Sequence, residues 1–171
     1  IKYENKYFFR DRTLNVSLEH TGFTSMELIK KGIADLGFRT ETKKELLLNY
    51  SADPVLLNKM EGSIEATEVI IPYSGVVTTS YKYDSEKKVY LRSVNNKAHV
   101  DYGSKEQYSV KNIITYQVSN HTLTGDVKGR QDIDNLGSGT GYYISEGYAI
   151  PIKWEKKYKA SQTIYTYMDG T

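Results

Sequence analysis

The hydrophobic pattern of the chain changes near residue 63. After that point, polar and apolar residues alternate in short runs rich in valine, isoleucine, threonine and tyrosine, a period and composition typical of strands. Strands are predicted over residues 69–71, 76–83, 89–94, 113–118, 141–145, 148–153 and 163–167. Turn residues at 84–88 and at Glu146-Gly147 separate two pairs of these strands, so we expect hairpins there. The pattern predicts an antiparallel meander or a partly rolled sheet.

Before residue 63 the clearest predicted element is a helix over residues 25–36. Its apolar side chains recur at helical spacing, at Met26, Ile29, Ile33 and Leu36. Thr24 followed by Glu27 has the spacing of a capping box, and Gly37 can take the left-handed conformation that ends a helix. The sequence therefore predicts both ends of this helix as well as its apolar face.

The other segments before residue 63 give weaker signals. A strand is expected over residues 7–11, and residues 45–50 fit either helix or strand, because periodicity does not distinguish the two in a short apolar run. Asp53-Pro54 is suited to start a short helix. Residues 58–63 are polar and contain a glycine, so we place a linker there.

These patterns predict an α+β fold class with two parts: a small helix-containing segment over residues 1–60 and a mainly antiparallel β-rich domain over residues 63–171. With 171 residues, 39% of them hydrophobic, the chain can bury a core. The 23 basic and 21 acidic residues give a net charge of only +2, which disfavours nucleic acid as a partner because phosphate neutralisation needs a clustered excess of cations. The absence of cysteine excludes disulfides, thiolate metal ligands and cysteine nucleophiles.

Several segments carry a family resemblance. Residues 132–154 join a glycine-dense stretch to a hairpin pattern and end on the only tryptophan, and residues 90–101 and 111–114 precede them. Together they resemble the C-terminal domain of the YerB-type lipoproteins of Gram-positive cell envelopes, a family without an established biochemical function. Residues 7–40, with Glu19-His20-Thr21 before the helix, resemble the N-terminal domain of the same family.

The resemblance implies where the protein acts and what it contacts. Family members carry a lipid-attachment cysteine and further sequence on the N-terminal side, so this chain is expected to be a fragment of an extracytoplasmic lipoprotein on the outer face of the cell membrane. The lipid anchor, absent from this chain, would be the contact with the membrane. The expected partner is another protein or a cell-wall polymer.

The glycine-dense stretch, residues 137–141, raises the question of a phosphate site. Phosphate-binding glycine loops open a helix whose amides face the anion, whereas a predicted strand follows this stretch. Its spacing also lacks the lysine of a P-loop and the register of a dinucleotide fingerprint. We therefore expect a structural loop that makes a tight bend or a bulge.

Asp132 and Asp134 are weak candidates for a metal site. Their spacing puts both carboxylates on one face of an extended strand, and Asn135 adds an oxygen; oxygens are the ligands that Ca²⁺ and Mg²⁺ prefer. Ca²⁺ usually takes six or more oxygens, and the sequence does not indicate the others. The alternative is that these carboxylates are solvated or paired with Arg130, so neither a metal nor a cofactor is predicted.

Arg92, His99 and Asp101 are the candidate catalytic residues. His99 and Asp101 point to the same face of a strand, with Arg92 on the neighbouring predicted strand. They fit an acid–base pair with an anion clamp, or a cross-strand polar cluster without catalysis. The nucleophile elbow Gly-x-Ser-x-Gly and the zinc spacing His-Glu-x-x-His do not occur. Tyr90, Arg92, His99 and Asp101 also match the family pattern, which supplies no reaction.

Tyrosine is unusually frequent, with 16 residues against four phenylalanines. Half-buried sheet positions explain most of this, because tyrosine combines an apolar body with a polar tip. Tyrosine is also enriched at binding surfaces, and the candidates for ligand binding are Tyr81, Tyr83, Tyr90, Tyr142 and Trp154. The favoured function is therefore a non-catalytic binding module that uses a tyrosine-rich sheet face. The alternative is a hydrolase or transferase on a cell-envelope substrate.

Overall fold

The computed structural model describes residues 3–42, 48 and 50–171, and the chain forms two compact units, Ile1–Leu48 and Asn49–Thr171. The boundary between the two units precedes residues 58–63. The linker predicted there therefore lies inside the second unit. There the short 3-10 helix η2 (Leu57–Lys59) packs against strand β13 (Tyr148–Lys156), and Leu57 is 2% exposed. The helix predicted to start at Asp53-Pro54 is wrong, because the chain is irregular from 50 to 56.

The first unit contains one α-helix, α1 (Met26–Leu36), among its described residues. The two-stranded pair of β1 (Phe9–Arg10) and β2 (Gly22–Phe23) and the 3-10 helix η1 (Leu18–Thr21) precede it. The helix and its end at Gly37, where φ is 65°, are confirmed. Four of the six residues in the segment predicted as 45–50, namely 45–47 and 49, lie outside the described residues.

The start of α1 differs from the predicted capping box. Ser25 is the capping residue, and its hydroxyl accepts a hydrogen bond from the Leu28 amide at 3.2 Å. The Thr24 hydroxyl instead donates to the Tyr7 carbonyl at 2.7 Å, which ties the start of the helix to the segment before β1. Both residue types can cap a helix. Ser25 is the cap here because its backbone is extended, at φ −127°, as a capping residue requires.

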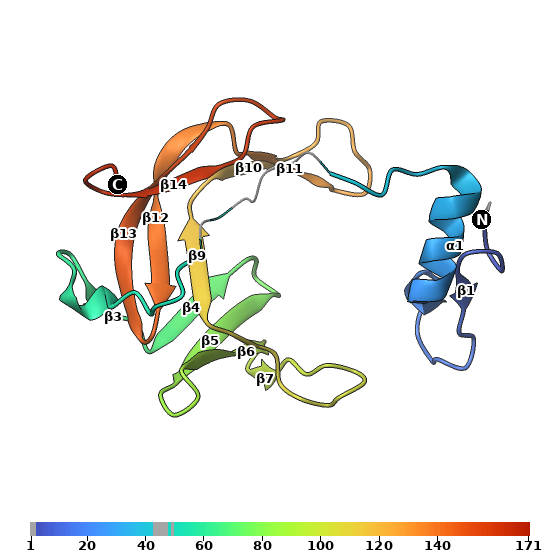
Figure 1. The fold of residues 1–171 in the computed structure, drawn as a ribbon, viewed down its shortest axis with the longest axis horizontal. Helices are drawn as coiled ribbons and strands as arrows, with labels where there is room; N and C mark the ends of the chain where they lie inside the picture. Colours follow the sequence, from blue (N-terminus) through green and yellow to red (C-terminus); the bar gives the residue numbers. More distant parts are fainter. Residues whose placement is uncertain (1–2, 43–47, 49) are drawn as a thin grey trace. The chain divides into compact units, whose positions relative to one another are not determined.

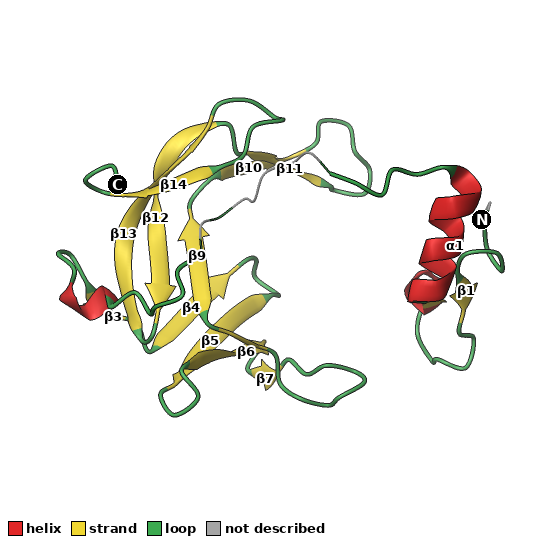
Figure 2. Cartoon of the chain, viewed as in Figure 1, coloured by secondary structure: helices red, strands yellow, loops and turns green. Residues whose placement is uncertain are grey.

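The second unit is built mainly from two antiparallel sheets (Figures 1 and 2). The first has the order β14-β13-β12-β9, and β3 also pairs with β13. The bounds are β3 (Ile64–Glu65), β9 (Asn112–Tyr116), β12 (Gly137–Ser145) and β14 (Ile164–Tyr167). In Figure 1, β12 and β13 run side by side as long curved strands.

The second sheet has the order β4-β5-β6-β7, and β8 also pairs with β6. The bounds are β4 (Glu68–Pro72), β5 (Thr78–Asp84), β6 (Val89–Val94), β7 (Lys97–Ala98) and β8 (Ser109–Val110). A separate ribbon consists of β10 (Ser119–Thr122) and β11 (Gln131–Asp134). The predicted antiparallel, β-rich architecture is confirmed, and the helix is a minor part of the fold.

Apolar side chains from both sheets form the core between them. Tyr90 of β6, Ile113 of β9, Ile144 of β12 and Ala149 of β13 are buried together, and Ala66, Val69, Tyr81 and Tyr83 pack against them. Burial of this apolar surface is the main favourable contribution to folding. Within the described residues, no helix is long and apolar enough to span a bilayer.

The predicted bend or bulge in the glycine-dense stretch is wrong, because that stretch is the first part of β12. Every residue from Gly137 to Ser145 pairs in register with β13. The glycines are needed for close approach: a Cβ on Gly139 would lie 2.7 Å from the indole nitrogen of Trp154, and a Cβ on Gly141 would lie 2.1 Å from the Thr115 carbonyl oxygen. Neighbouring strands, not a turn, therefore determine where these glycines occur.

Candidate functional site

A pocket of about 520 Å³ lies over β9, β12 and β13. Its base is a row of three paired residues, because Tyr142 lies opposite Thr115 of β9 on one side and Pro151 of β13 on the other. Thr140 points to the same face as Tyr142, since alternate residues of a strand share a face. The complete lining is Thr115, Tyr116, Gln117, Thr140, Gly141, Tyr142, Pro151 and Met168.

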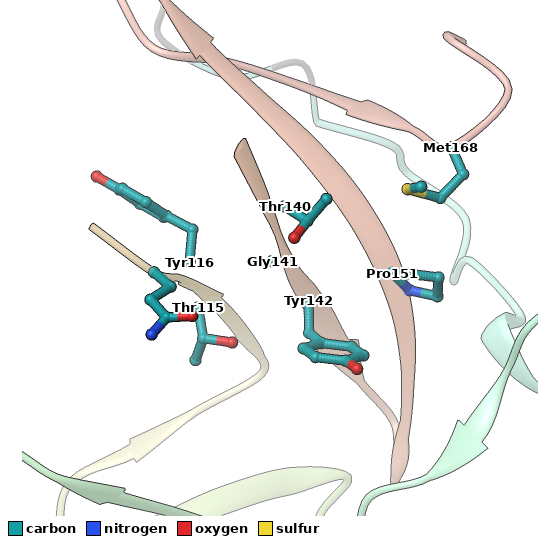
Figure 3. A pocket seen from close by; sticks show the side chains of 8 residues that line it. Thr115, Tyr116, Thr140, Gly141, Tyr142, Pro151 and Met168 are labelled. Carbon is teal, nitrogen blue, oxygen red and sulfur yellow. The ribbon is translucent and has the colours of Figure 1, made fainter. Parts of the chain in front are cut away.

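Met168 closes one side of this pocket from the segment that follows β14 (Figure 3). The ammonium group of Lys153, on β13, donates to the Met168 carbonyl at 2.8 Å, and Lys153 pairs with Thr140 in the sheet. This contact fixes the position of the backbone at Met168. Strands β9, β12 and β13 and the segment after β14 therefore build one site.

The lining chemistry is polar but uncharged. None of the eight lining residues carries a charge, while Thr115, Gln117 and Thr140 offer hydroxyl and amide groups that both donate and accept hydrogen bonds. Tyr142 is 45% exposed, and Pro151 and Met168 add apolar surface. An aromatic ring, apolar edges and a few neutral polar groups form a site suited to a neutral, hydroxyl-rich ligand.

The opposite face of the same strands is filled with aromatic side chains. The Trp154 ring centroid lies 5.3 Å from that of Tyr116, which lies 5.9 Å from that of Tyr165. Trp154 is only 4% exposed, and its indole nitrogen has no hydrogen-bond partner among the described residues. In Figure 3 the Tyr116 side chain extends away from Tyr142. Trp154 therefore packs inside the fold instead of facing the pocket.

The other predicted tyrosines also contribute to packing. Tyr90 is fully buried, and its ring lies 5.0 Å from that of Tyr83. Tyr81 and Tyr83 are half-buried against the same core. Burial raises the pKa of the Tyr90 hydroxyl, and the pKa of Tyr83 is raised for the same reason. Of the five candidates for ligand binding, Tyr142 lines the pocket and the other four do not.

The structure brings Arg92 and His99 into direct contact. The Arg92 guanidinium meets the Nδ1 atom of His99, and the His99 and Tyr108 rings lie 4.7 Å apart. Asp101 joins this cluster through Tyr108, whose hydroxyl donates to the Asp101 carboxylate at 3.1 Å. Hydrogen bonds from the Ser104 amide and the Tyr108 hydroxyl lower the pKa of Asp101.

Asp132 and Asp134 both lie on β11, so their carboxylates are on one face of that strand. The Asp132 carboxylate accepts a hydrogen bond from the Ile133 amide at 2.9 Å, and the Asp134 carboxylate lies 3.8 Å from the Nδ1 atom of His121. Arg130 pairs with Asp126, at 3.0 Å, and not with these two residues. Across the part of the chain that the structure describes, no three acidic or histidine side chains gather into a possible metal site.

One local signal in the sequence points to part of the pocket. A two-residue turn at Glu146-Gly147 fixes the register of the hairpin, which places Tyr142 opposite Pro151 and Thr140 opposite Lys153. Thr115 and Met168 could not be found in this way, because β9 and the segment after β14 reach the site through long-range pairing. Sequence reasoning therefore predicted one lining residue, Tyr142, and missed its neighbours.

Comparisons with known proteins agree with this fold. Residues 69–171 match the family described as "Protein of unknown function (DUF3048) C-terminal domain", and the chain belongs to this family. It is 26% identical over 140 residues to the protein named "Putative lipoprotein YerB" from Bacillus subtilis (strain 168), and the match covers 80% of this chain and 40% of that protein. The resemblance inferred from the sequence motifs is confirmed.

A solved structure shows the same fold. The crystal structure of the YerB protein from Bacillus subtilis matches with a TM-score of 0.66 at 22% sequence identity. The match covers 95% of this chain and 54% of that chain. The present chain thus spans about half of the solved relative and less than half of the full-length one.

Proposed function

We propose that the second unit is a non-catalytic binding module that holds a neutral glycan of the cell wall in the Tyr142 pocket. The observation that carries the proposal is the composition of the lining: one exposed aromatic ring beside threonine and glutamine side chains, with no charged group among the eight residues. A sugar ring has an apolar face that packs on an aromatic ring and hydroxyl groups that pair with neutral donors and acceptors.

The rigidity of the strands supports this proposal. Thr115, Tyr142 and Pro151 occupy paired positions on three adjacent strands, so their spacing is set by the sheet. A site on paired strands is preorganised, and preorganisation lowers the entropic cost of binding. Repeating sugar units of a polymer can contact such a row in succession.

The proposed location follows from the relative's name. The Bacillus subtilis relative is named "Putative lipoprotein YerB", and we propose that this protein is a lipoprotein as well. A lipid anchor on the outer face of the cell membrane would hold the pocket next to the wall. This location provides the proposed ligand at high local concentration.

The hydrolase or transferase alternative is less well supported by the geometry. It requires His99 as a base that Asp101 orients. The hydrogen bonds found for Asp101 come from Tyr108 and from the turn amides of Gly103 and Ser104, while Arg92 occupies the Nδ1 atom of His99. The binding function is the one that the described contacts favour.

Calorimetric titration with soluble, uncharged glycan fragments of the wall tests the proposal. Tyr142→Ala removes the exposed ring and is expected to weaken binding about tenfold, since aromatic contacts at binding sites contribute on the order of 1–2 kcal/mol. Tyr73→Ala is the matched control, because Tyr73 is 68% exposed and lies outside the pocket. Absence of saturable binding, or equal loss in both variants, contradicts the proposal.

A further inference from the structure

Arg92 lies on the inner face of the second sheet, at one end of the core. It is two residues from Tyr90 on β6 and therefore shares its face, and its side chain is half-buried. One guanidinium nitrogen contacts the Nδ1 atom of His99, and the other lies 3.5 Å from the hydroxyl of Thr79, which is itself buried. The guanidinium is thus held between two strands and the segment that carries His99.

The charge of Arg92 has no acidic partner among the described residues. Two of the four other arginines do have one: Arg10 lies 3.5 Å from Glu4, and Arg130 lies 3.0 Å from Asp126. A cation that is partly removed from water is costly unless an anion or a set of acceptors compensates for it. With five N–H donors, Arg92 keeps several that neither His99 nor Thr79 uses.

The contact with Arg92 also fixes the tautomer of His99. An arginine side chain only donates hydrogen bonds, so the Nδ1 atom of His99 must accept, and the ring proton of the neutral histidine is then on Nε2. The Tyr108 ring, at 4.7 Å, restrains the orientation of the imidazole. His99 is exposed and therefore presents an N–H donor to solvent beside the guanidinium.

We propose that Arg92 and His99 form an anion-binding site for a phosphate or carboxylate group, separate from the Tyr142 pocket. The planar fork of a guanidinium matches the two oxygens of such a group, and the Nε2–H of His99 supplies an additional donor. Asp101 joins the cluster only through Tyr108, and its carboxylate accepts hydrogen bonds from the Tyr108 hydroxyl and the amides of Gly103 and Ser104. The proposal does not depend on glycan binding.

Nuclear magnetic resonance titration with inorganic phosphate tests this site directly. Saturable shifts are expected for the Arg92 Nε–H and for the His99 ring. Arg92→Lys keeps the positive charge but loses the planar fork of the guanidinium. We expect phosphate binding to weaken about tenfold, because losing one charge-assisted hydrogen bond lowers the binding constant by about that factor. His99→Ala changes an exposed side chain, so it provides a variant that does not disturb the core.

Lys97→Gln is the control, because Lys97 is an exposed cation on neighbouring β7 and should titrate like the wild type. Titrations with acetate and with glycerol phosphate show whether the site takes a carboxylate, or a phosphate carried on a larger molecule. Two results overturn the proposal: phosphate leaves Arg92 unshifted, or Arg92→Lys and His99→Ala bind phosphate as well as Lys97→Gln does. Equal shifts with chloride and phosphate also overturn it, since they indicate charge screening alone.

Discussion

The hydroxyl oxygen of Tyr90 accepts a hydrogen bond from the Gly147 amide at 2.9 Å. The same hydroxyl donates to the Ala66 carbonyl at 3.0 Å. Tyr90 belongs to β6 of one sheet, whereas Gly147 forms the turn between β12 and β13 of the other. One fully buried side chain therefore joins the two sheets of the second unit and fixes the end of the hairpin that carries Tyr142.

Tyr90→Phe is expected to lower the free energy of unfolding by about 1–3 kcal/mol. The substitution keeps the ring but leaves the Gly147 amide and the Ala66 carbonyl without this partner, and buried unpaired polar groups cost about that much. Chemical denaturation followed by circular dichroism measures the change. Tyr102→Phe, at an exposed residue, is the control, and a similar loss in both variants would argue against the role of Tyr90.

Alkaline pH should destabilise the second unit through the same residue. Burial raises the pKa of Tyr90 above the ordinary value of 10.0, so the folded state favours the neutral hydroxyl. This contribution is fully present below the unfolded pKa and is lost as the pH rises through the folded pKa. Unfolding free energies measured at increasing pH should fall above about pH 10, and less steeply in Tyr90→Phe. Parallel pH profiles for the two proteins would count against this explanation.

Gly141→Ala should be severely destabilising. The added Cβ would lie 2.1 Å from the Thr115 carbonyl oxygen, and this atom is backbone that cannot move without breaking the pairing of β9 with β12. We expect a loss of about 3 kcal/mol or more, as for other overpacked sites. Gly75→Ala is the control, because nothing lies within 4 Å of a Cβ there, and its melting temperature should stay near that of the wild type. Equal melting temperatures for the two variants would refute the packing argument.

The first unit offers a separate test at the start of α1. Ser25→Ala removes the hydroxyl that accepts from the Leu28 amide, and a lost helix cap costs about 1 kcal/mol. Hydrogen exchange at Leu28 should become faster, whereas Ser25→Asp should preserve protection because aspartate also caps helices. Unchanged exchange in Ser25→Ala would show that the cap contributes nothing.

Local signals made much of this fold predictable. The Glu146-Gly147 turn and the end of α1 at Gly37 depend on residues next to each other in the sequence, and both were predicted. The glycines at Gly139 and Gly141 predict a bend, which is wrong because the groups that require glycine there, Trp154 and Thr115, come from other strands. Their effect becomes visible only when the strands are paired.

Polar strands and long-range contacts explain what the sequence could not reveal. β10 and β11 are exposed along their whole length, so no alternation of apolar residues marks them. In the candidate site, Tyr142 is predictable because tyrosine is a residue type enriched at binding surfaces. Met168 is not predictable, because it lines the pocket only through the packing of the segment after β14. A pocket built from separate strands leaves no motif in the sequence.

The most direct test of the proposed function uses the three methionines of the chain as probes. Met168 lines the pocket, whereas Met26 and Met60 do not. In a protein labelled with ¹³C at the methionine methyl groups, titration with uncharged wall glycan fragments should shift the Met168 signal to saturation and leave the other two unchanged. An unmoved Met168 signal at high glycan concentration, or equal shifts of all three signals, would contradict binding in the Tyr142 pocket.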